Sequence, residues 1–311
     1  MKQKVPIKKK AQIVTIFVAL TIGVASGVLL QKYIGVRDIL RAIGVSHRAQ
    51  SLAQATQKSE GNIPEEFIGK LQLFIFAGQS NMSGRGDIRQ SETSTNPRVY
   101  VFGNDYRWRL AKEPIDDSSN QVDEVSKDLD AGFSPATSFA TKILERHPNM
   151  VIGLIPCAKG GKSIDDWQRN LSDNTLYGSC LKRVRAASTM GDIAGLLFYQ
   201  GTLDALDPMQ FPSLKLLPNQ WADKFTAFIS NWRDDLNLPA LPVVFAQIGT
   251  NKEPDIFKNW AIVQEQQRAV QLPFCTMITT DDLTLEDAVH FTNESYKKIG
   301  QRFAQAYLDL R

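Results

Sequence analysis

From Leu71 onward, short apolar runs alternate with amphipathic segments, and this alternation is the feature that most constrains the fold of this chain. Continuous apolar strands separated by amphipathic helices are typical of a mostly parallel sheet, because right-handed crossovers place helices on both of its faces. The pattern therefore predicts a single α/β domain. Its expected strands are 71–78, 98–103, 150–157, 193–201, 241–249 and 274–280, and its expected helices are 135–147, 176–190, 221–236, 260–271 and 293–308.

The N-terminal region has a different character. Five lysines within residues 1–10 precede residues 11–31, a 21-residue segment without a charged side chain. At about 1.5 Å of rise per residue, a helix of this length spans a hydrocarbon core of about 30 Å. Because basic flanks tend to stay in the cytoplasm, the segment predicts a membrane anchor with the rest of the chain outside the cytoplasm. A cleaved signal peptide is the alternative, since small residues at 24–26 would suit cleavage and yield a secreted protein.

Residues 32–68 predict a short helix and then a polar linker that contains Gly61 and Pro64. The expected organisation is therefore a basic cytoplasmic tail, a transmembrane or signal segment, this linker and one large domain. Their boundaries are 1–10, 11–31, 32–68 and 69–311.

Charge and cysteine content argue against two kinds of partner. The formal net charge is +3, but five lysines belong to the tail, so the remainder is nearly neutral and no basic stripe suggests nucleic acid. The three cysteines form no Cys-x-x-Cys or Cys/His cluster, so we expect no metal and no cofactor. A Cys157–Cys180 bridge is conceivable in an oxidising compartment, but free, buried cysteines are the favoured expectation.

Unusual polar residues follow several of the predicted strands. In open α/β sheets, sites form where loops leave the carboxyl ends of strands. Four such loops carry reactive or flexible residues here: Gln79, Ser80 and Asn81 after the first strand; Lys159, Gly160 and Gly161 after "GLIPCA"; Gly201, Thr202 and Asp204 after "GLLFYQ"; and "EDAVH" after the last strand.

The stretch "FIFAGQSNMSGRGD" suggests a nucleophile. A strand that runs directly into Gly-x-Ser needs Gly78, because the backbone turns sharply there and a Cβ would crowd it. Ser80 would then lie at the strand tip, where its hydroxyl could attack an ester carbonyl if a base removed the proton. By itself, Gly-x-Ser in a polar turn is more often structural.

The chain has three histidines from which a base could come. His47 lies in the linker, and His147 ends a predicted helix just before a proline. His290 follows Asp287 by three residues, so the carboxylate can accept from one ring nitrogen, select the tautomer and leave the other nitrogen as a base. In the alternative arrangement, Asp204 contacts His290 and Asp287 is only a turn residue.

An attacked carbonyl becomes an oxyanion, which needs preorganised hydrogen-bond donors. The candidates are the backbone N–H of Ser80, that of Gly160 or Gly161, and the side-chain amide of Gln200. The glycines of "AKGGKS" do not have the spacing of a phosphate-binding loop.

Taken together, these motifs resemble the sialate O-acetylesterase and acetylxylan esterase branch of the SGNH hydrolases, carbohydrate esterase family six. The matching pieces occur in family order and cover nearly all of residues 71–310. They are "GQSNMSGRGD", "PATSFA", "IPCAKGGKSIDDW", "GLLFYQGTLDA" and "DAVHFTNESYKKIGQRFA". The resemblance implies a three-layer, flavodoxin-like α/β/α fold and metal-independent hydrolysis of acetyl esters on sugars. It also implies Ser80 as nucleophile and His290 as base.

The chain departs from the family pattern at two positions. Thr202 stands where relatives commonly have a glutamate, and Lys162 replaces a common threonine. We therefore expect either a serine esterase that deacetylates a carbohydrate or, as the alternative favoured by Thr202, a membrane-tethered glycan-binding protein with little turnover. Aromatic faces and forked donors suit sugar rings. The expected substrate-binding residues are Gln79, Asn81, Arg85, Trp108, Trp167 and Thr202.

Overall fold

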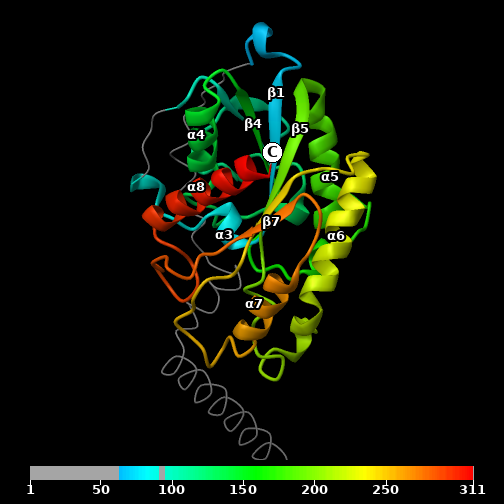
Figure 1. Ribbon diagram of the computed structural model, residues 1–311, viewed down its shortest axis with the longest axis vertical. Coiled ribbons are helices and arrows are strands. Elements are labelled where there is room, and N and C mark those ends of the chain that lie inside the picture. Colours follow the sequence, from blue (N-terminus) through cyan, green and yellow to red (C-terminus); the bar gives the residue numbers. More distant parts are fainter. Residues whose placement is uncertain (1–62, 91–94, 311) are drawn as a thin grey trace, which may run out of the picture. The chain divides into compact units, whose positions relative to one another are not determined.

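The computed structural model describes residues 63–90 and 95–310 (Figure 1). Within them lies a seven-stranded sheet with the strand order β3-β2-β4-β1-β5-β6-β7. Neighbouring strands are parallel except for the antiparallel pair β2 and β3. The predicted α/β class with a mostly parallel sheet is therefore confirmed. The strands are β1 (Leu71–Gly78), β2 (Val99–Phe102), β3 (Trp108–Leu110), β4 (Val151–Pro156), β5 (Gly191–Tyr199), β6 (Val243–Ala246) and β7 (Cys275–Ile278).

Helices cover both faces of this sheet, with α4 and α8 on one side and α5 and α6 on the other (Figure 1). The α-helices are α3 (Ser80–Ser83), α4 (Ala136–Arg146), α5 (Leu176–Ala187), α6 (Trp221–Leu236), α7 (Trp260–Ala269) and α8 (Asn293–Asp309). Single 3₁₀ turns connect them at η1 (Glu65–Phe67), η2 (Ile88–Gln90), η3 (Glu124–Ser126), η4 (Asp165–Trp167), η5 (Ser188–Met190), η6 (Pro212–Leu214) and η7 (Pro218–Gln220).

Aromatic side chains build a separate apolar layer on each face. The Phe74 ring of β1 contacts Phe139 of α4 and Tyr307 of α8. The Phe198 ring of β5 packs against Phe228 of α6. Because successive strand residues point to opposite faces, a strand buried on both sides needs a nearly continuous apolar run. This requirement explains the apolar runs of the central strands.

The sequence analysis did not predict β3. This strand is only three residues long, has Arg109 at its centre and pairs with β2 alone. Its pairing follows a tight turn in which the Gly103 N–H donates to the Arg107 carbonyl at 2.9 Å. A hairpin strand this short has too few residues to produce an alternating apolar pattern.

Part of the predicted organisation lies outside the described residues. This applies to the basic tail 1–10, the anchor or signal segment 11–31 and the helix expected early in the linker 32–68. Across 63–90 and 95–310, the structure contains no helix with both the length and the apolar character that crossing a membrane requires.

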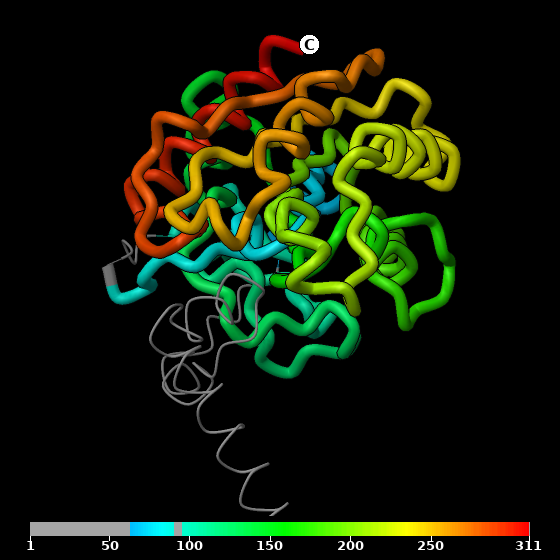
Figure 2. Tube along the Cα trace, turned by 90° about the horizontal axis from the view of Figure 1, so that it is seen from below, coloured from blue at the N-terminus to red at the C-terminus, as the bar shows by residue number. Residues whose placement is uncertain are grey.

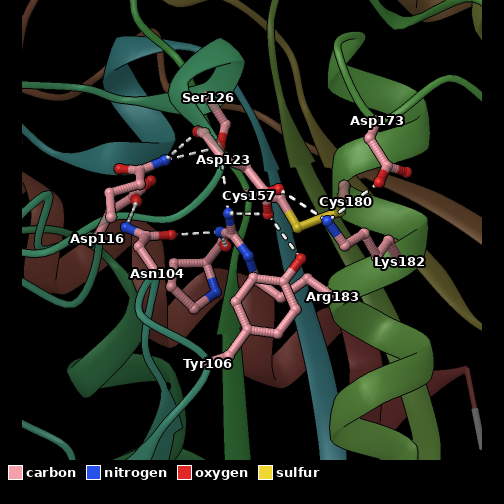
Figure 3. A network of polar contacts seen from close by, with 12 residues as sticks. Asn104, Tyr106, Asp116, Asp123, Ser126, Cys157, Asp173, Cys180, Lys182 and Arg183 are labelled. Atoms are coloured by element: carbon pink, nitrogen blue, oxygen red, sulfur yellow. Dashed lines mark hydrogen bonds and ion pairs between the residues drawn. A yellow bond between two sulfur atoms is a disulfide. The ribbon is translucent and has the colours of Figure 1, made fainter.

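The expectation of free cysteines is wrong for two of the three. Cys157, directly after β4, and Cys180 of α5 form a disulfide (Figure 3). Their Cα atoms lie 5.5 Å apart, within the range that a disulfide spans, because α5 packs against the end of β4. Cys275 at the start of β7 is free, as expected.

The disulfide closes a loop with a sequence separation of 23 residues. Replacing both partners in Cys157→Ser/Cys180→Ser is expected to lower the free energy of unfolding by about 3 kcal/mol, because the unfolded chain regains the entropy of the open loop. Urea titration measures this loss, and Cys275→Ser is the matched control that keeps the bridge. Thiol titration of the denatured, unreduced protein should detect one free thiol; three would contradict the pairing.

Candidate active site

Ser80 occupies the first position of α3, immediately after β1. Gly78 ends the strand with φ +133°, and a Cβ there would overlap the carbonyl group of Tyr199. The Gln79 N–H donates to the Tyr199 carbonyl at 2.8 Å, and the Gln79 carbonyl accepts from the N–H groups of residues 82 and 83. As the first helical residue, Ser80 keeps an N–H without an acceptor among the described residues. The local sequence thus places both a hydroxyl and a free donor at the strand tip.

His290 and Asp287 lie in the loop before α8, and His290 is 210 residues away from Ser80 in the chain. The Ser80 Oγ is 2.9 Å from His290 Nε2, and His290 Nδ1 is 2.8 Å from Asp287 Oδ2. The other carboxylate oxygen, Oδ1, accepts from the N–H groups of Val289 and His290 at 3.0 and 2.8 Å. The structure therefore brings the three residues of the predicted triad into one hydrogen-bonded chain.

The environment of Asp287 sets its charge. Burial alone would raise the pKa of Asp287, but the hydrogen bond and charge of His290 and two backbone N–H groups lower it to about 2. The carboxylate is thus ionised at neutral pH and accepts a hydrogen bond from the Nδ1–H group of His290. In this tautomer the Nε2 atom can accept a proton from Ser80.

Asn81 joins the nucleophile turn to the loop that carries the base. Its Nδ2 donates to the Val289 carbonyl at 3.0 Å, and its Oδ1 accepts from the Tyr296 hydroxyl at 2.8 Å. In both figures the orange segment before α8 lies beside the cyan segment after β1 (Figures 1 and 2). Both ends of the Asn81 amide are thus used within the protein, and its contact with a substrate stays a prediction.

Gln200 follows β5, and both the nitrogen and the oxygen of its side-chain amide form hydrogen bonds within the protein. Its Nε2 donates to Asp204 Oδ2, to the Lys162 carbonyl and to Gln79 Oε1, while its Oε1 accepts from Trp221 Nε1 at 2.8 Å. The structure therefore does not present this amide as the predicted oxyanion donor. The sequence contained no signal for Trp221, whose indole fixes the orientation of the amide.

Gln79 and Thr202 lie close to this amide network. Gln79 Oε1 accepts from the Gly201 N–H at 3.2 Å, while its Nε2 is buried without a partner in the described part of the chain. Thr202 follows Gly201 and is buried as well. Both residues remain predicted contacts of a substrate.

Asp204 is not the carboxylate that bonds to His290 in the structure. Its carboxylate accepts from the Gln200 amide and from the Ile164 N–H, whereas the hydrogen bond to His290 Nδ1 comes from Asp287. Burial raises the pKa of Asp204 to about 7, despite these hydrogen bonds. The alternative in which Asp204 orients His290 is thus not the arrangement in the structure.

The two glycines after β4 differ in what their N–H groups do. The Lys159 N–H donates to the Gly78 carbonyl at 3.1 Å, so this loop crosses the end of β1. The Gly160 N–H is taken by Asp128 Oδ2 at 2.8 Å. The Gly161 N–H has no acceptor within residues 63–90 and 95–310, and its φ is +67°. Of the two candidates, Gly161 is the one with a free donor.

Three residues that were predicted to contact substrate have partners within the protein. Arg85 forms an ion pair with Asp128 and also donates to the Gly84 carbonyl. Trp167 is fully buried between the rings of Phe198 and Phe228, and Trp108 lies against the Phe102 ring. The sequence suggested these residues by their chemical type, but only the tertiary structure shows which residues they pack against or pair with. The contacts of these three residues with a substrate stay predictions.

The described residues contain no group of three or more His, Cys, Asp or Glu side chains placed to hold a metal ion. The chemistry available at the site is that of a hydroxyl, an imidazole, a carboxylate and backbone donors. Such an arrangement suits nucleophilic attack on a carbonyl carbon.

Comparison with known proteins identifies relatives of the whole domain. Residues 70–309 match a family described as "Carbohydrate esterase, sialic acid-specific acetylesterase". A probable carbohydrate esterase of Arabidopsis thaliana is 32% identical over 255 residues, which cover 76% of this chain and 90% of that protein.

Solved structures give the same result for the fold. An Arabidopsis thaliana protein superposes with a TM-score of 0.63 at 30% identity, covering 77% of this chain and 98% of its own. A carbohydrate acetylesterase from Xanthomonas citri superposes with a TM-score of 0.57 at 20% identity, covering 77% of this chain and 56% of its own.

The low pKa of Asp287 makes its contribution to stability depend on pH. A carboxylate whose pKa is lowered by folding stabilises the native state above its unfolded pKa, here about 4, and loses that contribution as the pH falls toward 2. Asp287→Asn is therefore expected to cost on the order of 2 kcal/mol of unfolding free energy at pH 6 and progressively less at pH 4 and 3. Urea titrations of both proteins at each pH measure the difference; a cost that stays constant would contradict the pairing.

Proposed function

The chain belongs to the family of sialic acid-specific carbohydrate acetylesterases, and on this premise we propose that it removes O-acetyl groups from a carbohydrate through an acyl-enzyme on Ser80. Membership makes it a carbohydrate O-acetylesterase, a carboxylic ester hydrolase. The observation that carries the mechanism is the hydrogen-bonded chain from Ser80 Oγ through His290 to Asp287.

The first half of the proposed reaction forms the acyl-enzyme. His290 Nε2 takes the proton of Ser80 as Oγ attacks the acetyl carbonyl carbon, and the imidazolium is stabilised by Asp287. Negative charge develops on the carbonyl oxygen, where the free N–H groups of Ser80 and Gly161 are the donors available to it. The C–O bond of the ester then breaks, and the sugar hydroxyl leaves with the proton from His290.

The second half releases acetate. Water replaces the sugar, gives a proton to His290 Nε2 and attacks the acyl carbon. The bond between that carbon and Ser80 Oγ then breaks, Oγ takes the proton back from His290, and acetic acid leaves and ionises to acetate. Within the site, every proton in this sequence moves between the imidazole and an oxygen atom. The proposed reaction therefore needs no metal ion and no cofactor.

We place the domain outside the cytoplasm, tethered by residues 11–31. Two features support this proposal: the five lysines before that uncharged segment, and the disulfide between Cys157 and Cys180, since structural disulfides persist in oxidising compartments.

Ser80→Ala and His290→Ala are each expected to lower hydrolysis of p-nitrophenyl acetate by about 10⁴-fold or more, because each removes a group that takes part in bond formation or proton transfer. The wild type should release a burst of nitrophenol that matches the enzyme concentration if deacylation is slower than acylation. The thermal midpoint should stay nearly unchanged in Ser80→Ala and fall in His290→Ala, which removes the partner of Asp287. Turnover in either variant close to that of the wild type would refute the mechanism, and a wild type without turnover would favour the glycan-binding alternative.

Variants of Asp287 and Asp204 provide the matched control for this experiment. Asp287→Asn should lower turnover by roughly 10³ to 10⁴-fold, since an amide selects the wrong tautomer of the base. Asp204→Asn should keep most of the activity, because Asp204 contacts the Gln200 amide and the Ile164 N–H. The reverse order would show that Asp204 orients His290.

The full-length protein is expected to fractionate with membranes and to resist carbonate extraction, because residues 11–31 are long enough to span the bilayer. Leu20→Arg/Thr21→Arg should weaken this retention, since each charge near the middle of the segment opposes insertion by about 3 kcal/mol. A mature chain that starts near Gly27 in the soluble extracytoplasmic fraction would instead demonstrate cleavage of a signal peptide.

A further inference from the structure

A buried carboxylate outside the triad joins two loops of the site. Asp128 lies in the connection between β3 and α4, with 1% of its side chain exposed. Its Oδ2 lies 2.8 Å from Ser83 Oγ, 2.9 Å from Arg85 Nη2 and 2.8 Å from the Gly160 nitrogen. One oxygen atom thus connects the end of the nucleophile helix α3 to the loop that follows β4.

The segment that carries Asp128 is itself fixed by hydrogen bonds from a buried arginine. Arg183 of α5 is fully buried and donates to Asn104 Oδ1, to the Pro156 carbonyl and to Ser126 Oγ, the last at 3.2 Å (Figure 3). Ser126 precedes Asp128 by two residues, so the carboxylate is attached to a fixed part of the fold and not to a free loop.

The hydrogen bond of the Gly160 N–H to Asp128 decides which N–H of this loop stays unpaired among the described residues. Because Asp128 takes the Gly160 N–H, that group cannot also stabilise a developing oxyanion. The next residue, Gly161, turns with φ +67° and keeps its N–H free within the described residues. The Lys159 N–H pairs with the Gly78 carbonyl, and the Lys162 carbonyl accepts from Gln200 Nε2 at 3.0 Å, so the loop is held on both sides of this turn.

The positive charge of Arg85 offsets the negative charge of the Asp128 carboxylate, which lies close to a site where negative charge is expected to develop. Arg85 binds both oxygens of Asp128, at 3.1 and 2.9 Å. Burial alone would raise the pKa of Asp128, but the charges of Arg85 and Lys159 and the hydrogen bonds of Arg85 and Ser83 lower it. Asp128 therefore remains an ionised acceptor whose charge is offset by its partner.

We propose that Asp128 is a positioning residue that, by holding the Gly160 N–H, directs the Gly161 N–H toward the acetyl carbonyl oxygen during attack by Ser80. This role rests on the acyl-Ser80 mechanism proposed above. Under this proposal the β3–α4 connection supplies no member of the triad, but it influences how the oxyanion is stabilised through the position of the Gly161 N–H.

The test is Asp128→Asn in the full chain, assayed with p-nitrophenyl acetate. Removing a whole oxyanion donor costs about 10²- to 10³-fold in kcat, so a misdirected donor should cost about 10- to 100-fold, with KM changed less than about 3-fold. Inhibition by 1,1,1-trifluoroacetone, which adds to serine and places an oxyanion in the same position, should weaken by the same factor as kcat.

Asp123→Asn is the matched control, because Asp123 is a buried carboxylate of the same connection that accepts from the Tyr106 hydroxyl and pairs with Lys182 (Figure 3). It should lower the thermal midpoint while leaving kcat within about 2-fold. If Asp128→Asn does not fold, Asp128→Glu replaces it: this variant keeps the charge for Arg85 but displaces the carboxylate by one methylene, so the same loss of kcat is expected.

Three results would overturn the inference. Equal losses of kcat in the variants at 123 and 128 would show an effect of loop stability alone. Unchanged kcat and trifluoroacetone inhibition in the Asp128 variant, with Ser80→Ala inactive, would refute the role of Asp128 and leave the proposed function standing. A wild type without esterase activity would refute both.

Discussion

The site depends on how closely β1 and β5 approach each other at Gly78. A Cβ at this position would overlap the Tyr199 carbonyl group, and φ is +133°, so glycine alone suits both the space and the turn. The following N–H, that of Gln79, donates to the same carbonyl, and the Gln79 side chain accepts from the Gly201 N–H. The turn that carries Ser80 is thereby attached to the neighbouring strand, and its position follows that of the sheet.

Buried polar groups then fix the surrounding loops, because leaving such a group without a partner costs about 1 to 3 kcal/mol. Asn81 satisfies both ends of its amide with the histidine loop and with Tyr296 of α8. Asp128 satisfies its carboxylate with α3 and with the loop after β4. Each of these side chains joins segments that are distant in the sequence, so the requirement for hydrogen-bond partners sets the spacing of the candidate reactive groups.

Asp204, which is buried, and Asp287, which is partly buried, show how environment separates similar residues. Asp287 lies against an imidazole and two backbone N–H groups, which lower its pKa to about 2. Asp204 has only neutral donors as hydrogen-bond partners, and burial raises its pKa to about 7. Asp287 stays negatively charged beside the base, whereas burial favours the neutral form of Asp204, which hydrogen-bonds to Gln200.

The sequence by itself determined the fold class, the family and the positions of Ser80, Asp287 and His290 as candidates, because alternation of apolar runs, a Gly-x-Ser turn and a three-residue spacing are local patterns. The catalytic roles of those three residues stay predictions. Only the tertiary structure decided that Asp287 and not Asp204 pairs with His290, that Cys157 pairs with Cys180, and that the Gly160 N–H belongs to Asp128. The three-residue strand β3 was likewise recognisable only once it paired with β2. The physical reason is common to all of these cases. A buried donor, thiol or strand edge pairs with the partner that packing brings close in space, and residues that are neighbours in the chain do not determine which distant residue that is.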